Sequence, residues 1–304
     1  MSKPTPQAKT RDKAVHANRE AERPVTVSAR WLVSAICIVL AAAIVCTWGT
    51  ICLMFWQGSW QLLYHPTASI SRTPASAGIA FDDVEFGSSP AGMPQLKGWW
   101  VPAGSQARYT AIFLHGATGN LSDTIDALAR LHAAGVDVLA FDYRGYGQSA
   151  FARPSEERLR QDAEAATLYL ADTRHVSPSS LVLVGNGLGA NLALQLASAH
   201  SELAGVVLEE PLEAPMDAIF RDPRARLVPA RLLVNDSWDA KAAAAKLRIP
   251  SLWFFRQDGK PAWFESVTSR KIGVWLANPA TAHRDYEKAL TRWLVDLSDR
   301  SESR

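Results

Sequence analysis

The segment from Leu181 to Ala190 has the form of a strand, a tight turn and a helix start, which is where some enzymes present a nucleophile. It reads Leu-Val-Leu-Val-Gly-Asn-Gly-Leu-Gly-Ala. A serine nucleophile on such a turn occupies the middle of Gly-x-Ser-x-Gly, where its hydroxyl is exposed. Here the flanking glycines are Gly185 and Gly189, and Gly187 occupies the middle position. The pattern therefore predicts a nucleophile turn that lacks the nucleophile.

Other segments that follow apolar runs carry residues that could complete such a site. One is the glycine-rich stretch 115–120, His-Gly-Ala-Thr-Gly-Asn. The backbone N–H groups of such a turn can bind a developing oxyanion. Another is the stretch 141–147, Phe-Asp-Tyr-Arg-Gly-Tyr-Gly. Nearer the C-terminus, Asp258 and His283 each follow a predicted strand.

Alternating strands and helices are predicted to position these residues. From Ala111 onward the apolar runs are continuous, which is typical of parallel strands covered on both faces. The predicted strands are 80–86, 96–101, 111–114, 136–141, 181–184, 205–209, 252–255 and 272–276. The predicted helices are 122–134, 155–171, 188–199, 239–247 and 284–297. Repeated strand–helix units favour a single α/β domain with a sheet of about eight strands.

In combination, these motifs resemble those of the membrane-anchored α/β-hydrolases of the Bem46-like group, which are related to serine-aminopeptidase-like hydrolases. The matching pieces are the turn 115–120, the 141–147 block with Pro-Ser-Glu-Glu at 154–157, the turn 185–189, and Leu208-Glu209. The resemblance covers roughly residues 80–297. It implies the α/β-hydrolase fold, a mostly parallel sheet flanked by helices.

The resemblance also implies roles for single residues. In such enzymes serine, aspartate and histidine follow one another along the chain; serine attacks an acyl carbon, histidine takes its proton, and aspartate orients the imidazole. Carried over to this chain, His283 occupies the general-base position and Asp258 the orienting position. Gly187 occupies the nucleophile position. The backbone N–H groups of Ala117 and Leu188 are expected to form the oxyanion hole.

Two of these assignments have a plainer alternative. The family usually has Gly-x-x-Asp before Val-Pro, whereas this chain reads Arg-Gln-Asp-Gly-Lys-Pro over 256–261. Asp258 is therefore also consistent with an ordinary turn residue. His283, near a helix start, is alternatively an exposed side chain without a role. His115 is expected to be structural under either reading.

The missing hydroxyl predicts a loss of catalysis. A nucleophile turn has strained backbone angles that cost an ordinary residue on the order of 1–3 kcal/mol, and glycine adopts them freely. Cysteine offers no substitute, because Cys37, Cys46 and Cys52 all lie in the apolar stretch 31–56. Removing a triad serine costs several orders of magnitude in rate. We therefore expect a pseudoenzyme, a hydrolase fold retained as a binding or regulatory module for an acyl or peptide ligand.

Two other functions remain open from the residues alone. His283 could activate water against a bound ester, leaving residual esterase, thioesterase or peptidase activity. Separately, Gly-x-Gly-x-x-Ala over 185–190 fits the dinucleotide fingerprint, with Glu209 about twenty residues further on. A Rossmann domain does not account for the glycine turn at His115 or the position of His283, and it usually begins with the fingerprint strand.

The N-terminal residues predict a membrane anchor. Residues 1–30 carry seven Lys and Arg against three Asp and Glu, which indicates a basic, disordered tail. Residues 31–56 contain no charged side chain, and a helix of that length exceeds the ~30 Å hydrocarbon core. A buried core helix and a cleaved signal peptide are the alternatives. The positive-inside rule places the N-terminus in the cytoplasm and the domain on the other side, the periplasm in a bacterium.

The remaining predictions concern boundaries and partners. Residues 57–78 are expected to be a linker and 79–304 the α/β-hydrolase domain, with 211–250 as a cap or lid. The cap carries Arg221, Arg224, Arg226 and Arg231, which either meet an anionic ligand or lipid headgroup or form a solvated face. The net charge of +2 favours no acidic partner. Without metal-ligand spacing or a nucleic-acid motif, no cofactor, metal ion or nucleic acid is expected. No protein partner is identified.

Overall fold

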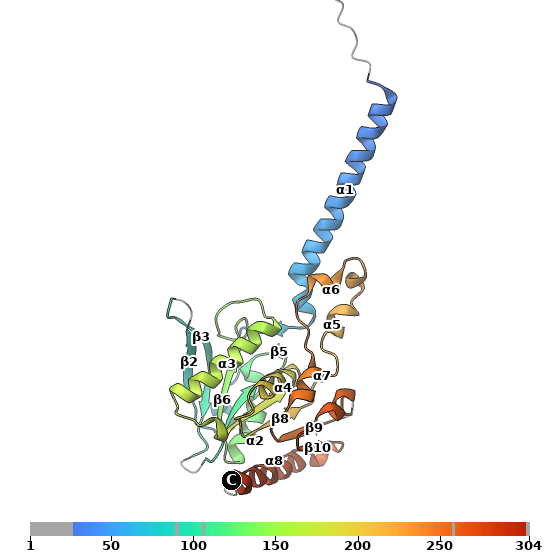
Figure 1. Cartoon of the computed structure of the whole chain (residues 1–304). Coiled ribbons are helices and arrows are strands. Elements are labelled where there is room, and N and C mark those ends of the chain that lie inside the picture. Colours follow the sequence, from blue (N-terminus) through green and yellow to red (C-terminus); the bar gives the residue numbers. More distant parts are fainter. Residues whose placement is uncertain (1–26, 89–90, 105–106, 257–258, 302–304) are drawn as a thin grey trace, which may run out of the picture. The chain divides into compact units, whose positions relative to one another are not determined.

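The computed structural model describes residues 27–88, 91–104, 107–256 and 259–301, so Asp258 lies outside the described residues. The chain divides into two units, residues 1–50 and 51–304. A single helix, α1 (Ala29–Gly58), begins in the first unit and ends in the second. Within the described ranges, the helical stretch from Ala29 to Leu62 is the one long and apolar enough to cross a membrane (Figure 1). The predicted N-terminal apolar helix is therefore confirmed.

A mostly parallel sheet of eight strands forms the centre of the second unit (Figure 1). The strand order is β10-β9-β8-β7-β4-β6-β3-β2. Only the β2–β3 and β3–β6 pairs are antiparallel. The strands are β2 (Asp82–Ser88), β3 (Pro94–Val101), β4 (Thr110–Leu114), β6 (Asp137–Asp142), β7 (Leu181–Asn186), β8 (Gly205–Glu209), β9 (Ser251–Phe255) and β10 (Lys271–Trp275). Each of the eight predicted strands corresponds to one of these.

The central strands are buried on both faces, as their continuous apolar runs predicted. In each of β4, β8 and β9, all five residues are buried. Alternate residues of β4 enter opposite cores: Ile112 packs with one apolar cluster and Phe113 with the other. Since successive side chains of a strand point to opposite faces, the sheet separates two hydrophobic layers.

Helices cover both faces of the sheet. The first layer is shared by α3 (Glu156–Asp172), α4 (Leu188–Ala199) and α7 (Ala240–Lys246), whose apolar side chains join the cluster that contains Ile112. The second is shared by α2 (Ile125–Ala133) and α8 (Pro279–Ser301), which join the cluster that contains Phe113. Parallel strands covered by helices on both faces are the arrangement expected of an α/β domain.

Two helices differ from the prediction at their N-termini. Helix α2 begins later than predicted, because Asn120 caps a separate 3-10 turn, η3 (Leu121–Asp123). Helix α8 begins at Pro279, five residues earlier than the predicted 284–297. Asn278 accounts for this early start, since its Oδ1 accepts the Ala280 N–H at 3.0 Å. An asparagine cap followed by proline is a common helix start, and here it brings His283 into the helix.

The segment between β8 and β9, predicted as a cap, is built from short helices. These are α5 (Asp217–Phe220), η5 (Pro223–Arg226) and α6 (Ala230–Leu233), followed by α7. Met216, Ile219 and Trp238 of this segment are buried in the same core as α4. The segment is therefore attached to the sheet domain through apolar contacts.

Residues after α1, predicted as a linker, are packed against the domain by short elements. The first is a 3-10 turn, η1 (Ser59–Leu62), and the last is a second turn, η2 (Pro74–Ala77). Between them, β1 (His65–Pro66) pairs in parallel with β5 (Thr118–Gly119). Tyr64 connects this segment to the predicted cap: its hydroxyl donates to Asp236 Oδ2 at 2.5 Å and accepts from Trp238 Nε1 at 3.1 Å.

Replacing Tyr64 with Phe should destabilise the domain, because the buried indole N–H of Trp238 loses its acceptor. An unsatisfied buried donor costs about 1–3 kcal/mol in unfolding free energy. Urea denaturation followed by tryptophan fluorescence measures the change. Tyr169→Phe is the matched control: the Tyr169 hydroxyl accepts only a part-buried bond from Arg174 Nε at 3.2 Å, so a smaller loss is expected. Equal midpoints for Tyr64→Phe and the unsubstituted protein would contradict this role of Tyr64.

Candidate active site

The turn at Gly187 has the backbone conformation of a nucleophile turn. Strand β7 ends at Asn186 and α4 begins at Leu188, and Gly187 between them has φ 56° and ψ −121°. L-residues rarely adopt such a positive φ, whereas glycine does so freely. The Gly187 N–H donates to Glu209 O at 2.9 Å, which ties the turn to β8. A Cβ placed on Gly187 would have no atom within 4 Å, so a side chain here would meet open space.

The two flanking glycines are required for a different reason, the close approach of neighbouring backbone. A Cβ on Gly185 would lie 2.2 Å from Gly189 O. A Cβ on Gly189 would lie 2.0 Å from Leu114 O and 2.4 Å from His115 O. Any other residue would therefore push α4 away from the end of β4. Close packing therefore holds both flanking positions to glycine, whereas the central position has room for a side chain.

The amides predicted to form the oxyanion hole are free of protein partners. Among the described residues, neither the Ala117 nor the Leu188 N–H donates a hydrogen bond. Both residues line a cavity of about 450 Å³, which Gly187 also lines. An N–H group at the first turn of a helix has no acceptor within that helix, so the Leu188 amide is free for a ligand. The structure therefore brings Gly187, Ala117 and Leu188 together at one cavity.

His115 holds the peptide that carries the Ala117 N–H. Its Nδ1 lies 2.8 Å from Gly116 O and donates to it, since a carbonyl oxygen only accepts. The C=O and N–H of a trans peptide point in opposite directions, so this bond turns the Ala117 N–H away from the imidazole. The Ala117 carbonyl is fixed as well, by the Tyr146 hydroxyl at 2.8 Å and the His65 N–H at 2.8 Å. This geometry agrees with the structural role expected of His115.

The loop after β6 braces the same turn from behind. The Tyr143 hydroxyl donates to His115 O at 3.1 Å, and the two rings are 4.3 Å apart between centroids. Asp162 holds the loop in place, because its carboxylate accepts the Arg144 N–H at 2.8 Å and Arg144 Nε at 2.5 Å. The tyrosine-rich block 141–147, whose aromatic side chains are buried, therefore holds the turn 115–120 in place.

Burial shifts the pKa values of His115 and Asp142 in opposite directions. Desolvation lowers the pKa of His115 to about 4 and raises the pKa of Asp142 to about 7. His115 Nε2 lies 3.6 Å from Asp142 Oδ1 and has no hydrogen-bond partner among the described atoms. Below pH 7 the carboxyl is mostly protonated, and above pH 4 the imidazole is mostly neutral. Over that range the contact is therefore between two largely uncharged groups.

The predicted general base, His283, does not line the cavity that Gly187, Ala117 and Leu188 share. His283 lies in the first turns of α8 with 69% of its side chain exposed, and its Nε2 is 3.0 Å from Glu287 Oε1. It lines a second cavity of about 570 Å³, and Gly187, Ala117 and Leu188 do not line that cavity. Asp258 lies outside the described residues. Within the described ranges, no hydroxyl or thiol is bonded to the His283 imidazole.

A charged cluster lies where the two cavities adjoin, and sequence reasoning did not identify it. Glu209, Arg130 and Arg256 line both cavities. The Tyr286 hydroxyl donates to Glu209 Oε1 at 2.6 Å, and Arg130 Nη2 lies 3.6 Å from Glu209 Oε2. Desolvation raises the pKa of Glu209, while the charge of Arg130 opposes the rise. The available signal was Glu209 itself, a carboxylate at the end of a buried strand that requires a partner.

The opposite pKa shifts give opposite pH dependences of stability. His115 takes up a proton near pH 6.5 when unfolded and near pH 4 when folded, so it makes stability rise with pH between those values. Asp142 loses its proton near pH 3.8 when unfolded and near pH 7 when folded, so it makes stability fall as pH rises across that window.

Substituting either residue should therefore expose the contribution of the other. His115→Gln removes the rise due to His115, so its unfolding free energy should fall, relative to the unsubstituted protein, as pH rises from 4 to 6.5. Asp142→Asn should show the reverse, a relative rise from pH 4 to 7. Urea denaturation at several pH values gives both slopes. Parallel pH profiles for the two variants would contradict the shifts.

Comparisons with known proteins agree with this architecture. A model of the alpha/beta hydrolase family matches residues 111–303. An uncharacterized protein of Mycobacterium tuberculosis, Rv2307c, is 32% identical over 203 residues, which cover 66% of this chain and 69% of that protein. The human alpha/beta hydrolase domain-containing protein 17C is 33% identical over 145 residues, which cover 47% of this chain and 44% of that protein.

Solved structures share the fold at low sequence identity. The Pyrococcus furiosus esterase Pf2001 is 18% identical with a TM-score of 0.57, over 78% of this chain and 97% of that chain. The alpha/beta hydrolase GrgF from Penicillium sp. sh18 is 18% identical with a TM-score of 0.57, over 73% of this chain and 99% of that chain. The α/β-hydrolase fold expected from the sequence is confirmed, and the chain belongs to the alpha/beta hydrolase family.

Proposed function

We propose that this protein is a membrane-anchored pseudoenzyme of the Bem46-like group of α/β-hydrolases, which binds an acyl or peptide ligand without cleaving it. One observation carries the proposal: Gly187 occupies an intact nucleophile turn, and nothing lies within 4 Å of the point where its side chain would begin. A turn that keeps its packing and loses only its reactive group retains the means to bind.

The free amides support binding of a carbonyl or carboxylate group. The Ala117 and Leu188 N–H groups line the 450 Å³ cavity, and α4 begins at Leu188, so the partial positive charge of its N-terminus adds to theirs. In a catalytic relative one ligand oxygen occupies the oxyanion hole and a serine oxygen lies beside it. Here the place of the serine oxygen is open to a second ligand oxygen or to water.

The position of His283 favours the pseudoenzyme over residual hydrolysis. A general base must come within hydrogen-bond reach of the proton that it removes, directly or through one water. The His283 imidazole is largely exposed and paired with Glu287, one turn along the same helix. Family membership and the packing roles of Gly185 and Gly189 also account for the glycines of 185–190 without a dinucleotide.

The anchor is part of the proposal. Helix α1 would span the bilayer, with the basic residues 1–30 in the cytoplasm and the hydrolase-fold domain on the opposite side. A retained span holds the domain close to lipids, which are one source of acyl groups. Under this proposal Asp258 and His283, which the resemblance matches to the orienting and general-base residues, have no catalytic role, and the predicted cap, 211–250, covers the ligand.

The proposal predicts no hydrolysis that depends on His283. Purified full-length protein should not turn over p-nitrophenyl butyrate above the rate of its heat-denatured control, and His283→Ala should leave that rate unchanged. The reason is that Gly187 supplies no nucleophile and that the predicted general base, His283, does not line the cavity of the Ala117 and Leu188 amides. Release of p-nitrophenol measures both rates. Turnover that His283→Ala abolishes would establish the residual enzyme and remove the pseudoenzyme.

Ligand binding is tested by filling the open space at Gly187. In nanodiscs, hexanoate should raise the melting temperature in a concentration-dependent way, because a ligand that binds only the folded state stabilises it. Gly187→Leu should remove that rise by occupying the place of the ligand. Gly187→Ala is the matched control: it carries the same backbone strain, about 1–3 kcal/mol, but leaves most of the space. Equal hexanoate responses in the two variants would contradict binding at this turn.

A further inference from the structure

We propose that the surface around the end of α1 docks on the bilayer, with Arg153 and Arg158 binding lipid phosphate groups while Phe151 and Leu232 enter the interfacial layer. We call these four residues the docking face. The inference rests on the proposed membrane anchor. It goes beyond the anchor because it assigns a second membrane contact to the folded domain itself.

The end of the apolar stretch, at Trp56, indicates how deep this surface lies relative to the bilayer. Trp56 is the last residue of that stretch, and it belongs to the same unit as the sheet domain. Arg153 Nη2 donates to Trp56 O at 2.7 Å, and its guanidinium lies 5.7 Å from the centroid of a Trp56 ring. Tryptophan at the end of a span sits among the lipid headgroups. Arg153 is therefore held at the depth where phosphates lie.

Both arginines retain donors for an anion. The contacts of Arg153 and Arg158 are to backbone carbonyls, Trp56 O for the first and Arg153 O, at 2.8 Å, for the second. Within the described residues neither guanidinium forms an ion pair with a carboxylate. A guanidinium presents five donors in a planar fork that fits a phosphate, so most of those donors remain available.

The acids near the two arginines are already bound by other groups. The carboxylate of Asp236, whose charge acts on Arg153, accepts from the Tyr64 hydroxyl at 2.5 Å and from Glu156 N at 3.1 Å. Glu156 Oε2 accepts the backbone N–H groups of Ser237 and Trp238. Glu157 accepts three bonds from Arg160. These carboxylates therefore already accept hydrogen bonds within the protein, whereas most N–H donors of Arg153 and Arg158 remain available to a phosphate.

A cavity opens beside these arginines and has room for a headgroup. Its volume is about 700 Å³. Its walls combine apolar side chains, among them Trp56, Trp60 and Leu233, with three arginines, Arg153, Arg158 and Arg160, and with the acids Glu156, Glu157 and Asp236. Walls that combine apolar and charged side chains suit an amphipathic ligand. The cavity borders the last turn of α1, where a lipid that packs against the helix would place its headgroup.

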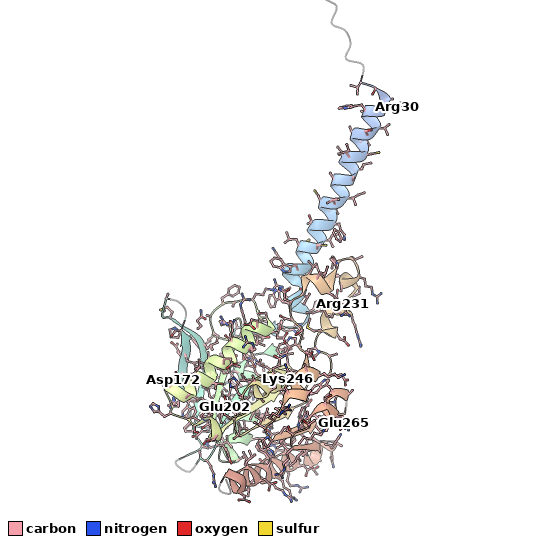
Figure 2. All side chains as sticks on the ribbon, viewed as in Figure 1. Arg30, Asp172, Glu202, Arg231, Lys246 and Glu265 are labelled. Carbon is pink, nitrogen blue, oxygen red and sulfur yellow. The ribbon has the colours of Figure 1, made fainter. Side chains whose placement is uncertain are left out.

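Exposed apolar side chains flank the cavity. Phe151 is fully exposed two residues before Arg153, and Leu232 is 82% exposed on α6, next to the cavity residue Leu233. Figure 2 labels the neighbouring Arg231, and Leu233 of the same helix lines the cavity together with Trp56 of α1. Single exposed apolar residues are ordinary on a protein surface. Leucine and phenylalanine interleaved with arginine at the end of a span form the combination that interfacial membrane contacts use.

The test places a fluorophore on the docking face of the full-length protein. With Cys37, Cys46 and Cys52 replaced by Ala, a single cysteine is introduced by Leu232→Cys or Phe151→Cys and labelled with an environment-sensitive nitrobenzoxadiazole dye. The protein is reconstituted into phosphatidylcholine vesicles containing doxyl-labelled lipid. Leu168→Cys is the control, exposed on α3 more than three turns from its start, toward the end marked by Asp172 in Figure 2. We expect quenching at 232 and 151 at least about twice that at 168.

The arginines are tested in the same vesicles. The double variant Arg153→Gln with Arg158→Gln should reduce quenching at 232 by about half or more. Arg248→Gln is matched, because Arg248 is also bonded to backbone carbonyls, at 3.1 and 3.3 Å, but it precedes the N-terminal end of β9, whereas Arg153 and Arg158 follow the C-terminal end of β6. Inorganic phosphate added to protein in maltoside micelles separates the two sources of phosphate. A stabilisation by free phosphate that the double variant abolishes, without lipid quenching, would overturn lipid docking.

The outcomes separate this inference from the proposed anchor. Carbonate extraction of the membranes measures whether the chain is integral. Retention in the membrane with equal, weak quenching at 232, 151 and 168 would overturn the docking face and leave the anchor standing. Release by carbonate would overturn the anchor, and the docking face with it. Retention with selective quenching that depends on the two arginines supports both.

Discussion

The close approach of α4 to the end of β4 is the constraint on which the rest of the site depends. Gly189 lies so near the Leu114 and His115 carbonyls that a single added carbon would overlap them. That approach sets where α4 begins, and therefore where the Leu188 N–H points. It also places the helix N-terminus beside the turn that carries Ala117. The oxyanion amides thus follow from backbone packing and do not depend on any reactive side chain.

Because of this arrangement, catalysis and folding are separable at Gly187. The flanking glycines are held by steric overlap, while the central position is constrained only by its positive φ. A residue with a side chain here adds strain of about 1–3 kcal/mol, and glycine removes it. Exchanging serine for glycine would therefore not destabilise the fold, but it would remove the nucleophile of a hydrolase. The proposed binding role rests on this separation, because the turn keeps its shape with or without a reactive side chain.

The strands and the nucleophile turn were predictable because their signals are local. Short apolar runs, continuous from Ala111 onward, identified all eight strands of the sheet, and the glycine spacing located the turn. The position of His283 was not predictable in the same way. Its surroundings depend on where α8 begins, which is set by the Asn278 cap, and on its pairing with Glu287. The Glu209, Arg130 and Tyr286 cluster joins three distant elements, so no window of sequence contains it.

That cluster also explains how α8 is held to the sheet without any contribution from His283. A buried carboxylate requires partners, and Glu209 finds them in Arg130 of α2 and Tyr286 of α8. The stacked contact of Arg130 over the Tyr286 ring, 4.6 Å from its centroid, adds to the same junction. These bonds fix α8 to the sheet through Tyr286, one turn beyond His283. The helix is therefore held by groups that catalysis does not use, and the imidazole is free to face solvent.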